Sequence, residues 1–273
     1  MRAFHLTQPD AFVRYHDLPG TEPARVYLAG LGWPAAAGYA HIVADAALSG
    51  RRSLLIDCLG FGLSDRPPDF SYTLDAHAEV VVALLDHLAL ATYDLIGHSF
   101  GGSVAVLVAA RRPERVATLV VADPNLDPGG GAFSAGIAAQ TEEAYVGRGH
   151  AELLARLRDA TLADADQTRA CMAGVVQIAD PRALHRSACS LVEMPPPTVR
   201  QCLLGLHMRR VLLVGAHTLE AEAASGSPAD WPYAAGLAAA GVRVSVVPDA
   251  GHAMVWDNPA GFARVTAQAL TTQ

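Results

Sequence analysis

Short segments that are apolar almost throughout alternate with segments of helical periodicity in the first half of the chain. One helical segment covers residues 76–90, and another, which includes Ser103, ends before Pro113 because proline interrupts a helix. Runs without polar positions are typical of parallel strands that are covered by helices on both faces. The alternation therefore predicts βαβ units and a doubly wound α/β sheet. The apolar runs occupy residues 25–30, 53–58, 93–97 and 116–123.

The pattern changes between residues 127 and 207. This stretch has the periodicity of successive helices and contains no convincing strand. The strand rhythm resumes at residues 209–216 and 242–252, and residues 260–270 close the chain as a helix. The expected division is therefore a core of residues 1–126 and 208–273 and an inserted helical unit of residues 127–207.

Composition and charge narrow the class of protein. The 273 residues are 51% apolar and 17% charged, which provides a large core and no sign of disorder. The net charge is −7, all 20 basic residues are Arg and no basic stripe is present, so no nucleic-acid partner is expected. The first 20 residues lack the apolar core of a signal peptide, and no run approaches the ~18 apolar residues of a membrane span. We therefore expect a cytoplasmic protein without membrane contact.

Neither a metal nor a cofactor is expected. The four cysteines show no CxxC pairing or metal-ligand spacing and are interpreted as buried free thiols. Residues 97–103 have the glycine spacing of a phosphate loop, but the chain contains no Lys that could hold the phosphates. The cysteines are Cys58, Cys171, Cys189 and Cys202.

Ser99 lies in the pentapeptide Gly97-His98-Ser99-Phe100-Gly101, which fits GxSxG between a buried strand and a helix. In this context the serine occupies a strained turn, and the flanking glycines let strand and helix approach closely. The helix N-terminus also directs free backbone N–H groups and a positive dipole end toward the serine. A serine that only caps the helix is the alternative at this stage.

Three separate segments resemble the α/β-hydrolase superfamily. Residues 53–67 are similar to its strand and GxGxSD segment, "GHSFGG" to its nucleophile elbow, and residues 246–263 to its histidine loop and final helix. The resemblance covers nearly the whole chain. It implies the α/β-hydrolase fold, with a mostly parallel eight-stranded sheet flanked by helices and a helical cap, or lid, inserted after strand six.

The same resemblance places the general base at His252, which follows a strand and Gly251. Serine has too high a pKa to attack unaided, so a neutral imidazole must take its proton and later return it to the leaving group. Asp249, just before this loop, is interpreted as a turn residue.

An oxyanion hole requires two backbone donors that are preset for the tetrahedral intermediate. We expect the N–H of Phe100, one residue after the nucleophile, and the N–H of Leu31, in the loop that follows residues 25–30. Trp33 and His98 are the candidates for the substrate pocket, with His98 interpreted mainly as a packing residue near the site.

The acid of the triad departs from the superfamily pattern. Most relatives have an Asp after the seventh strand, where this chain has Thr218, which cannot carry a negative charge. We expect Asp123 to substitute, because the carboxyl end of strand six lies one strand spacing, ~4.8 Å, from that of strand seven. Glu220, Asp127 and a dyad without an acid remain alternatives.

The predicted function is a serine hydrolase that cleaves an ester, thioester or lactone of a small, largely apolar substrate through an acyl-enzyme. An acyltransferase or cyclising enzyme that uses the same Ser-His machinery is the first alternative. A lyase or a ligand-binding protein on the same fold is the second, because a fold does not determine function.

Overall fold

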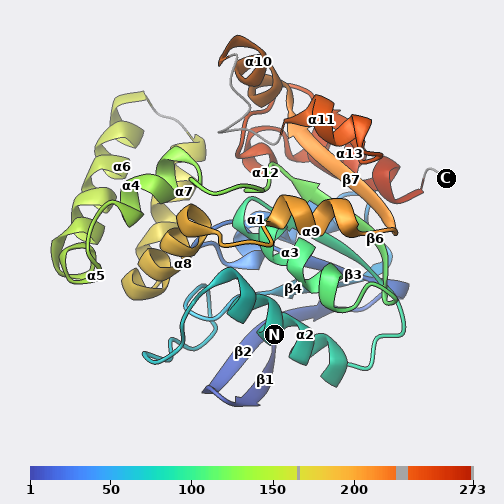
Figure 1. The fold of residues 1–273 in the computed structure, drawn as a ribbon, viewed down its shortest axis with the longest axis horizontal. Helices are drawn as coiled ribbons and strands as arrows, with labels where there is room; N and C mark the ends of the chain where they lie inside the picture. Colours follow the sequence, from blue (N-terminus) through green and yellow to red (C-terminus); the bar gives the residue numbers. More distant parts are fainter. Residues whose placement is uncertain (165–166, 226–232, 272–273) are drawn as a thin grey trace.

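The computed structural model describes residues 1–164, 167–225 and 233–271. Its centre is one eight-stranded sheet with the strand order β1-β2-β4-β3-β5-β6-β7-β8 (Figure 1). The strands from β3 onward run parallel, and β1 and β2 are antiparallel to their neighbours. The predicted α/β-hydrolase architecture is thereby confirmed. The strands are β1 (Arg2–Thr7), β2 (Asp10–Leu18), β3 (Thr21–Leu28), β4 (Arg51–Ile56), β5 (Tyr93–His98), β6 (Val116–Ala122), β7 (Arg209–Gly215) and β8 (Arg243–Val247).

The N-terminal hairpin is the part of the sheet that hydrophobic runs do not reveal. In β2, exposed Asp10 and Phe12 alternate with buried Ala11 and Val13. A strand with one covered face shows period-two alternation rather than a continuous apolar run. By contrast, every residue of β5 is buried, in line with its mainly apolar sequence.

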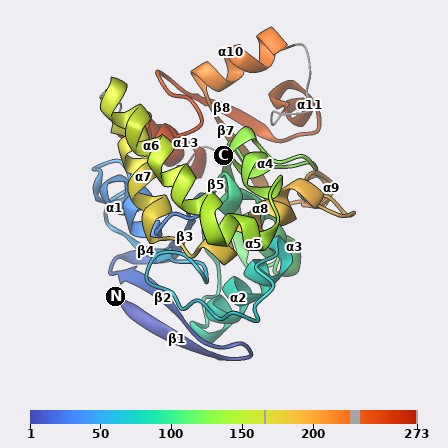
Figure 2. The ribbon, with the colours of Figure 1, turned by 90° about the vertical axis from the view of Figure 1, so that its left-hand side faces the viewer.

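Helices flank the sheet in two groups. α1 packs with α13, whereas α2 and α9 pack with α3. Figure 2 shows α1 to the left of the strands and α3 and α9 to their right. The core helices are α1 (Ala35–Ala44), α2 (Leu74–His87), α3 (Phe100–Arg111), α9 (Val199–Gly205), α10 (Ala216–Ser225), α11 (Ala234–Ala239), α12 (Met254–Asp257) and α13 (Pro259–Thr271).

A helical segment connects β6 to β7 and gathers on one side of the sheet (Figure 1). Arg186 of this segment donates to the carbonyls of Pro68 and Phe70 in the core and pairs with Glu142. α9, which follows this segment, packs with α3. The division into a core of residues 1–126 and 208–273 and an insertion of residues 127–207 remains a prediction. The segment contains α4 (Ala132–Ala138), α5 (Glu142–Ala144), the π-helical turn η1 (Tyr145–Gly149), α6 (His150–Asp164), α7 (Gln167–Ile178) and α8 (Pro181–Glu193).

None of the helices in the described part of the chain combines the length and the apolar character that crossing a bilayer requires.

Candidate active site

Ser99 connects β5 to α3 through a strained backbone. Its φ of 53° lies in the left-handed region, which residues other than glycine rarely adopt. A Cβ at Gly97 would lie 2.3 Å from the carbonyl oxygen of Gly101, and a Cβ at Gly101 would lie 2.4 Å from that of Leu28. Both glycines are therefore required by the close packing of strand and helix, and Ser99 lines the adjoining pocket.

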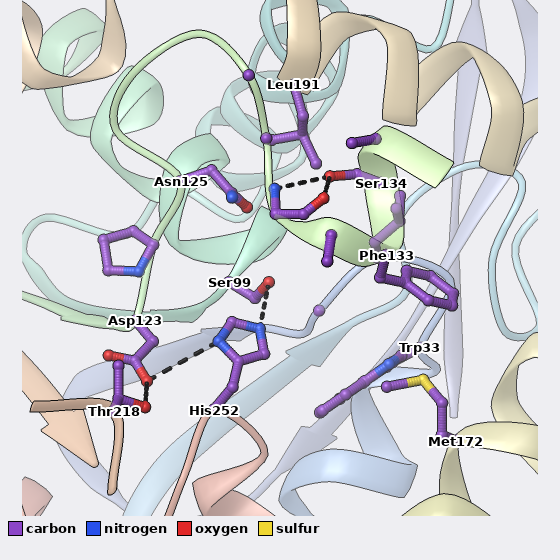
Figure 3. A pocket seen from close by; sticks show the side chains of 18 residues that line it. Trp33, Ser99, Asp123, Asn125, Phe133, Ser134, Met172, Leu191, Thr218 and His252 are labelled. Carbon is purple, nitrogen blue, oxygen red and sulfur yellow. Dashed lines mark hydrogen bonds and ion pairs between the residues drawn. The ribbon is translucent and has the colours of Figure 1, made fainter. Parts of the chain in front are cut away.

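His252 reaches Ser99 from the loop between β8 and α12. Its Nε2 lies 3.0 Å from Ser99 Oγ, within hydrogen-bond distance (Figure 3). Two contacts hold the loop in place: His98 Nε2 donates to the His252 carbonyl at 2.7 Å, and the Gly251 N–H donates to Asp257 Oδ2 at 2.9 Å. The nucleophile and base expected from the sequence are thus brought together.

Asp123 follows the last residue of β6 and lies on the other side of the imidazole (Figure 3). Its Oδ2 is 3.8 Å from His252 Nδ1, an ion-pair distance that is too long for a direct hydrogen bond. The residue is 3% exposed and has a φ of 39°, so it is a second strained, non-glycine position in the site. Its N–H donates to the Leu213 carbonyl of β7, which anchors the strained backbone.

Thr218 occupies the place that the superfamily pattern gives to the acid, and it contacts Asp123 directly. Located in the first turn of α10, it donates from Oγ1 to Asp123 Oδ2 at 2.9 Å. The alternative carboxylates have other surroundings: Glu220 is exposed on α10, and Asp127 pairs with Arg200 at 2.6 Å.

Burial governs the charge states of this group. The pKa of Asp123 is raised to about 8: burial is the largest cause and the charge of Glu222 adds to it, whereas hydrogen bonds from Thr218 and the Gly215 backbone oppose the rise. Desolvation lowers the pKa of His252, although 53% of its side chain is exposed to solvent. The charge of Asp257 opposes that shift. An isolated charge is therefore disfavoured at either residue, whereas opposite charges formed together would stabilise each other.

A family model described as "alpha/beta hydrolase fold" matches residues 31–189, which is more than half of the chain. The chain belongs to this family. Two solved α/β-hydrolase structures overlie it almost completely. An enol-lactonase from Burkholderia xenovorans LB400 has a TM-score of 0.76 at 22% identity, with 96% of this chain and 97% of that chain covered. An esterase from Thermogutta terrifontis has a TM-score of 0.73 at 22% identity, with 99% and 98% covered. They show the shared fold.

Curated relatives of this α/β-hydrolase match over shorter stretches. A 2-hydroxymuconate semialdehyde hydrolase from Pseudomonas sp. (strain CF600) is 41% identical over 96 residues, 35% of this chain and 34% of that one. Haloalkane dehalogenase 2 from Mycobacterium tuberculosis (strain ATCC 25618 / H37Rv) is 43% identical over 70 residues, 26% and 24% of the two chains. The matched stretches span about a third or less of these relatives. The activities in these names belong to those proteins, and this chain shares their family.

A pocket of about 540 Å³ opens at Ser99 of this α/β-hydrolase, between the core and the inserted helices. In Figure 3, three side chains of the inserted segment surround the pocket: Leu191 lies above Ser99, Phe133 to its right and Met172 beside Trp33 at the lower right. The sequence places these three residues in a helical insertion but contains no local signal for which side chains face the nucleophile. The lining residues are Gly30, Leu31, Trp33, Ser99, Asp123, Pro124, Asn125, Gly129, Gly130, Gly131, Ala132, Phe133, Ser134, Ala135, Met172, Leu191, Thr218 and His252.

The two pocket candidates from the sequence differ in position. Trp33 lines the pocket and stacks on Trp256 with ring centroids 4.0 Å apart. His98 does not line it: the ring is fully buried behind Trp33, 4.9 Å between centroids, and burial lowers its pKa to about 3. Its burial and its hydrogen bond to the His252 carbonyl fit the interpretation of His98 as a packing residue near the site, and a role in the substrate pocket remains a prediction.

The predicted oxyanion donors lie on two elements beside Ser99. Leu31 lines the pocket in the loop after β3. Phe100 is the first residue of α3, so its N–H has no acceptor in the preceding turn of that helix. Their role as a pair remains a prediction.

Proposed function

We propose that this chain is a serine hydrolase that cleaves an ester, thioester or lactone of a small, largely apolar substrate through an acyl-enzyme. The observation that carries the proposal is the 3.0 Å separation of Ser99 Oγ and His252 Nε2 at the base of a largely apolar pocket. This is the geometry that a general base needs to take the proton of an attacking hydroxyl.

In the proposed mechanism, His252 accepts the proton of Ser99 while Oγ attacks the substrate carbonyl carbon. The N–H groups of Leu31 and Phe100 stabilise the resulting oxyanion, and Asp123 stabilises the imidazolium. His252 then donates the proton to the leaving alkoxide or thiolate, which leaves an acyl group on Ser99. A water that His252 deprotonates attacks this acyl group, and collapse of the second intermediate releases the acid and restores Ser99.

The surroundings of Ser99 support an apolar acyl group. Trp33, Phe133, Met172 and Leu191 contribute aromatic, thioether and aliphatic surface to the pocket. Burial of such surface contributes about 25 cal/mol per Å² to binding. A substrate that fills the pocket with hydrocarbon should therefore bind more tightly than a short one.

The first prediction is that the protein hydrolyses p-nitrophenyl esters with acyl chains of graded length. The release of nitrophenol measures this activity. We expect activity to rise with chain length and to vanish in Ser99→Ala. A fluorophosphonate probe should label the wild-type protein and not Ser99→Ala. Glu220→Gln, which neutralises an exposed carboxylate of α10, is the matched control and should retain labelling and turnover. Equal labelling of Ser99→Ala, or no labelling of the wild type, contradicts the proposal.

The 41% identity to a 2-hydroxymuconate semialdehyde hydrolase favours a second candidate, the reaction in that name. It would use the same pocket. An assay of that compound beside the ester panel separates the two, and the substrate class with the larger kcat/KM identifies the function. Adding alcohol or amine acceptors and analysing the products distinguishes hydrolysis from acyl transfer.

A further inference from the structure

Thr218 and Asp123 form a buried pair behind the candidate base. Thr218 is 5% exposed and Asp123 is 3% exposed, and their side chains are 2.9 Å apart at Oγ1 and Oδ2. The same Oδ2 faces His252 Nδ1 at 3.8 Å (Figure 3). Among the described residues, Asp123 Oδ1 is buried and has no hydrogen-bond partner. The Thr218 hydroxyl is thus the side-chain donor to the carboxylate.

We propose that Thr218 is a positioning residue that orients Asp123 and maintains its negative charge for His252. The inference rests on the proposed function, in which Asp123 stabilises the imidazolium. A threonine at this place provides the donor for an acid that comes from the neighbouring strand. Thr218 follows β7, whereas Asp123 follows β6. Their hydrogen bond therefore connects the end of β7 to the carboxylate that faces the imidazole.

The hydroxyl acts against two unfavourable influences on the carboxylate. Burial in the protein disfavours the ionised form, and Glu222 of α10 adds like-charge repulsion. The groups on the other side are His252 itself and Asp257 of α12, whose charge acts on the imidazole. A hydrogen bond to a buried charged group contributes substantially because its loss leaves the charge without a partner.

The direction of the expected change follows from this balance. Without the hydroxyl, the pKa of Asp123 rises further, so ionisation requires a higher pH. The acidic limb of the pH profile should therefore move to higher pH, in addition to a loss of rate from misorientation. A residue that only fills space would leave the limb unchanged.

The test uses Thr218→Val, which has nearly the same shape but no hydroxyl, and Thr218→Ser, which restores the donor. The readout is the rate of Ser99 labelling by a fluorophosphonate between pH 5 and pH 9, which requires no knowledge of the natural substrate. We expect Thr218→Val to slow labelling by about 10- to 100-fold at neutral pH, as expected for loss of a hydrogen bond to a charged group. Its acidic limb should shift upward, and Thr218→Ser should recover most of the rate and the wild-type limb.

Thr118→Val is the matched control. Thr118 is also a buried threonine that forms a hydrogen bond with an aspartate, Asp94. This pair lies near the amino ends of β5 and β6, whereas Ser99 follows the carboxyl end of β5. Thr118→Val should lower the melting temperature without moving the pH profile. If Thr218→Val does not fold, Thr218→Ala and Thr218→Ser provide the same comparison.

The outcomes separate the two proposals. Labelling of wild-type Ser99 together with an unchanged rate and pH profile in Thr218→Val overturns the role of Thr218 alone. Failure of the wild type to label overturns the proposed function and this inference with it. A slower rate with an unchanged acidic limb identifies a packing role for Thr218 and also overturns the inference.

Discussion

At the scale of single residues, Asp123 combines a buried carboxylate with a strained backbone. Its folded-state pKa of about 8 exceeds the value near 3.9 of an exposed Asp. Between these two values the folded state binds a proton that the unfolded state releases. The stability associated with this group is therefore present at low pH and is lost as the pH rises toward the folded-state pKa. Such a residue costs stability at neutral pH and is retained where function requires its charge.

Asp123→Asn should accordingly separate stability from activity. We expect turnover to fall by up to about 10⁴-fold, the scale seen when such an acid is neutralised in other enzymes. The melting temperature should equal or exceed that of the wild type at pH 8, and this difference should shrink toward pH 4, where the wild-type carboxylate is protonated in the folded state. Calorimetry or circular dichroism at both pH values measures this. If the melting temperature of Asp123→Asn relative to that of the wild type were lower at pH 8 than at pH 4, the assignment of a buried charge that costs stability would be contradicted.

At the scale of elements, the turn between β5 and α3 depends on backbone approach. The Gly101 Cα lies so close to β3 that a Cβ would be 2.4 Å from the carbonyl oxygens of both Leu28 and Ala29. These are backbone atoms in the centre of the sheet and cannot move aside at low cost. The elbow is thus determined by the packing of β5, α3 and β3 as much as by the serine itself.

Gly101→Ala should therefore destabilise the protein, since overpacking in a rigid core costs roughly 1–3 kcal/mol and sometimes more. Gly174→Ala is the control, because Gly174 is exposed in α7 (Gln167–Ile178) and a methyl group there would meet no atom within 4 Å. That change should stabilise the protein by about 0.4–1 kcal/mol. Denaturant unfolding of both variants provides the comparison. Equal stabilities would show that the elbow tolerates a side chain.

At the scale of the whole molecule, the pocket exists only where the inserted helices meet the carboxyl ends of the strands. Its floor is formed by Ser99 and His252, and its walls include Phe133 of α4, Met172 of α7 and Leu191 of α8. The inserted segment thus contributes the apolar surface, whereas the core contributes the reacting groups. Substitutions in the inserted segment should therefore change the preferred substrate size without changing the chemistry at Ser99.

Met172→Trp should reduce the pocket volume and shorten the preferred acyl chain. We expect the KM for long-chain p-nitrophenyl esters to rise about tenfold, equivalent to about 1.4 kcal/mol of binding, with little change for the acetate ester. Leu162→Trp is the control, since Leu162 is 80% exposed on α6. A uniform fall in kcat for all chain lengths would place Met172 outside the acyl site.

Features that depend on local order could be predicted from the amino-acid sequence alone. Uniformly apolar runs and helical spacing predicted the parallel strands and helices, and GxSxG between strand and helix predicted the position of Ser99. The alternating strands of the N-terminal hairpin were not identified from hydrophobic runs, because each has only one buried face. The resemblance to α/β-hydrolases, rather than periodicity, identified His252.

Contacts between side chains that are distant in the sequence depend on the three-dimensional packing of the chain. This packing places Asp123 opposite His252, with Thr218 bonded to the carboxylate and His98 beneath the loop. It also determines which residues of the insertion line the pocket. His98 and His252 are 154 positions apart in the chain, and Asp123 and Thr218 are 95 positions apart. Local pattern encodes which element a residue belongs to, whereas a distance between elements depends on how the whole sheet packs.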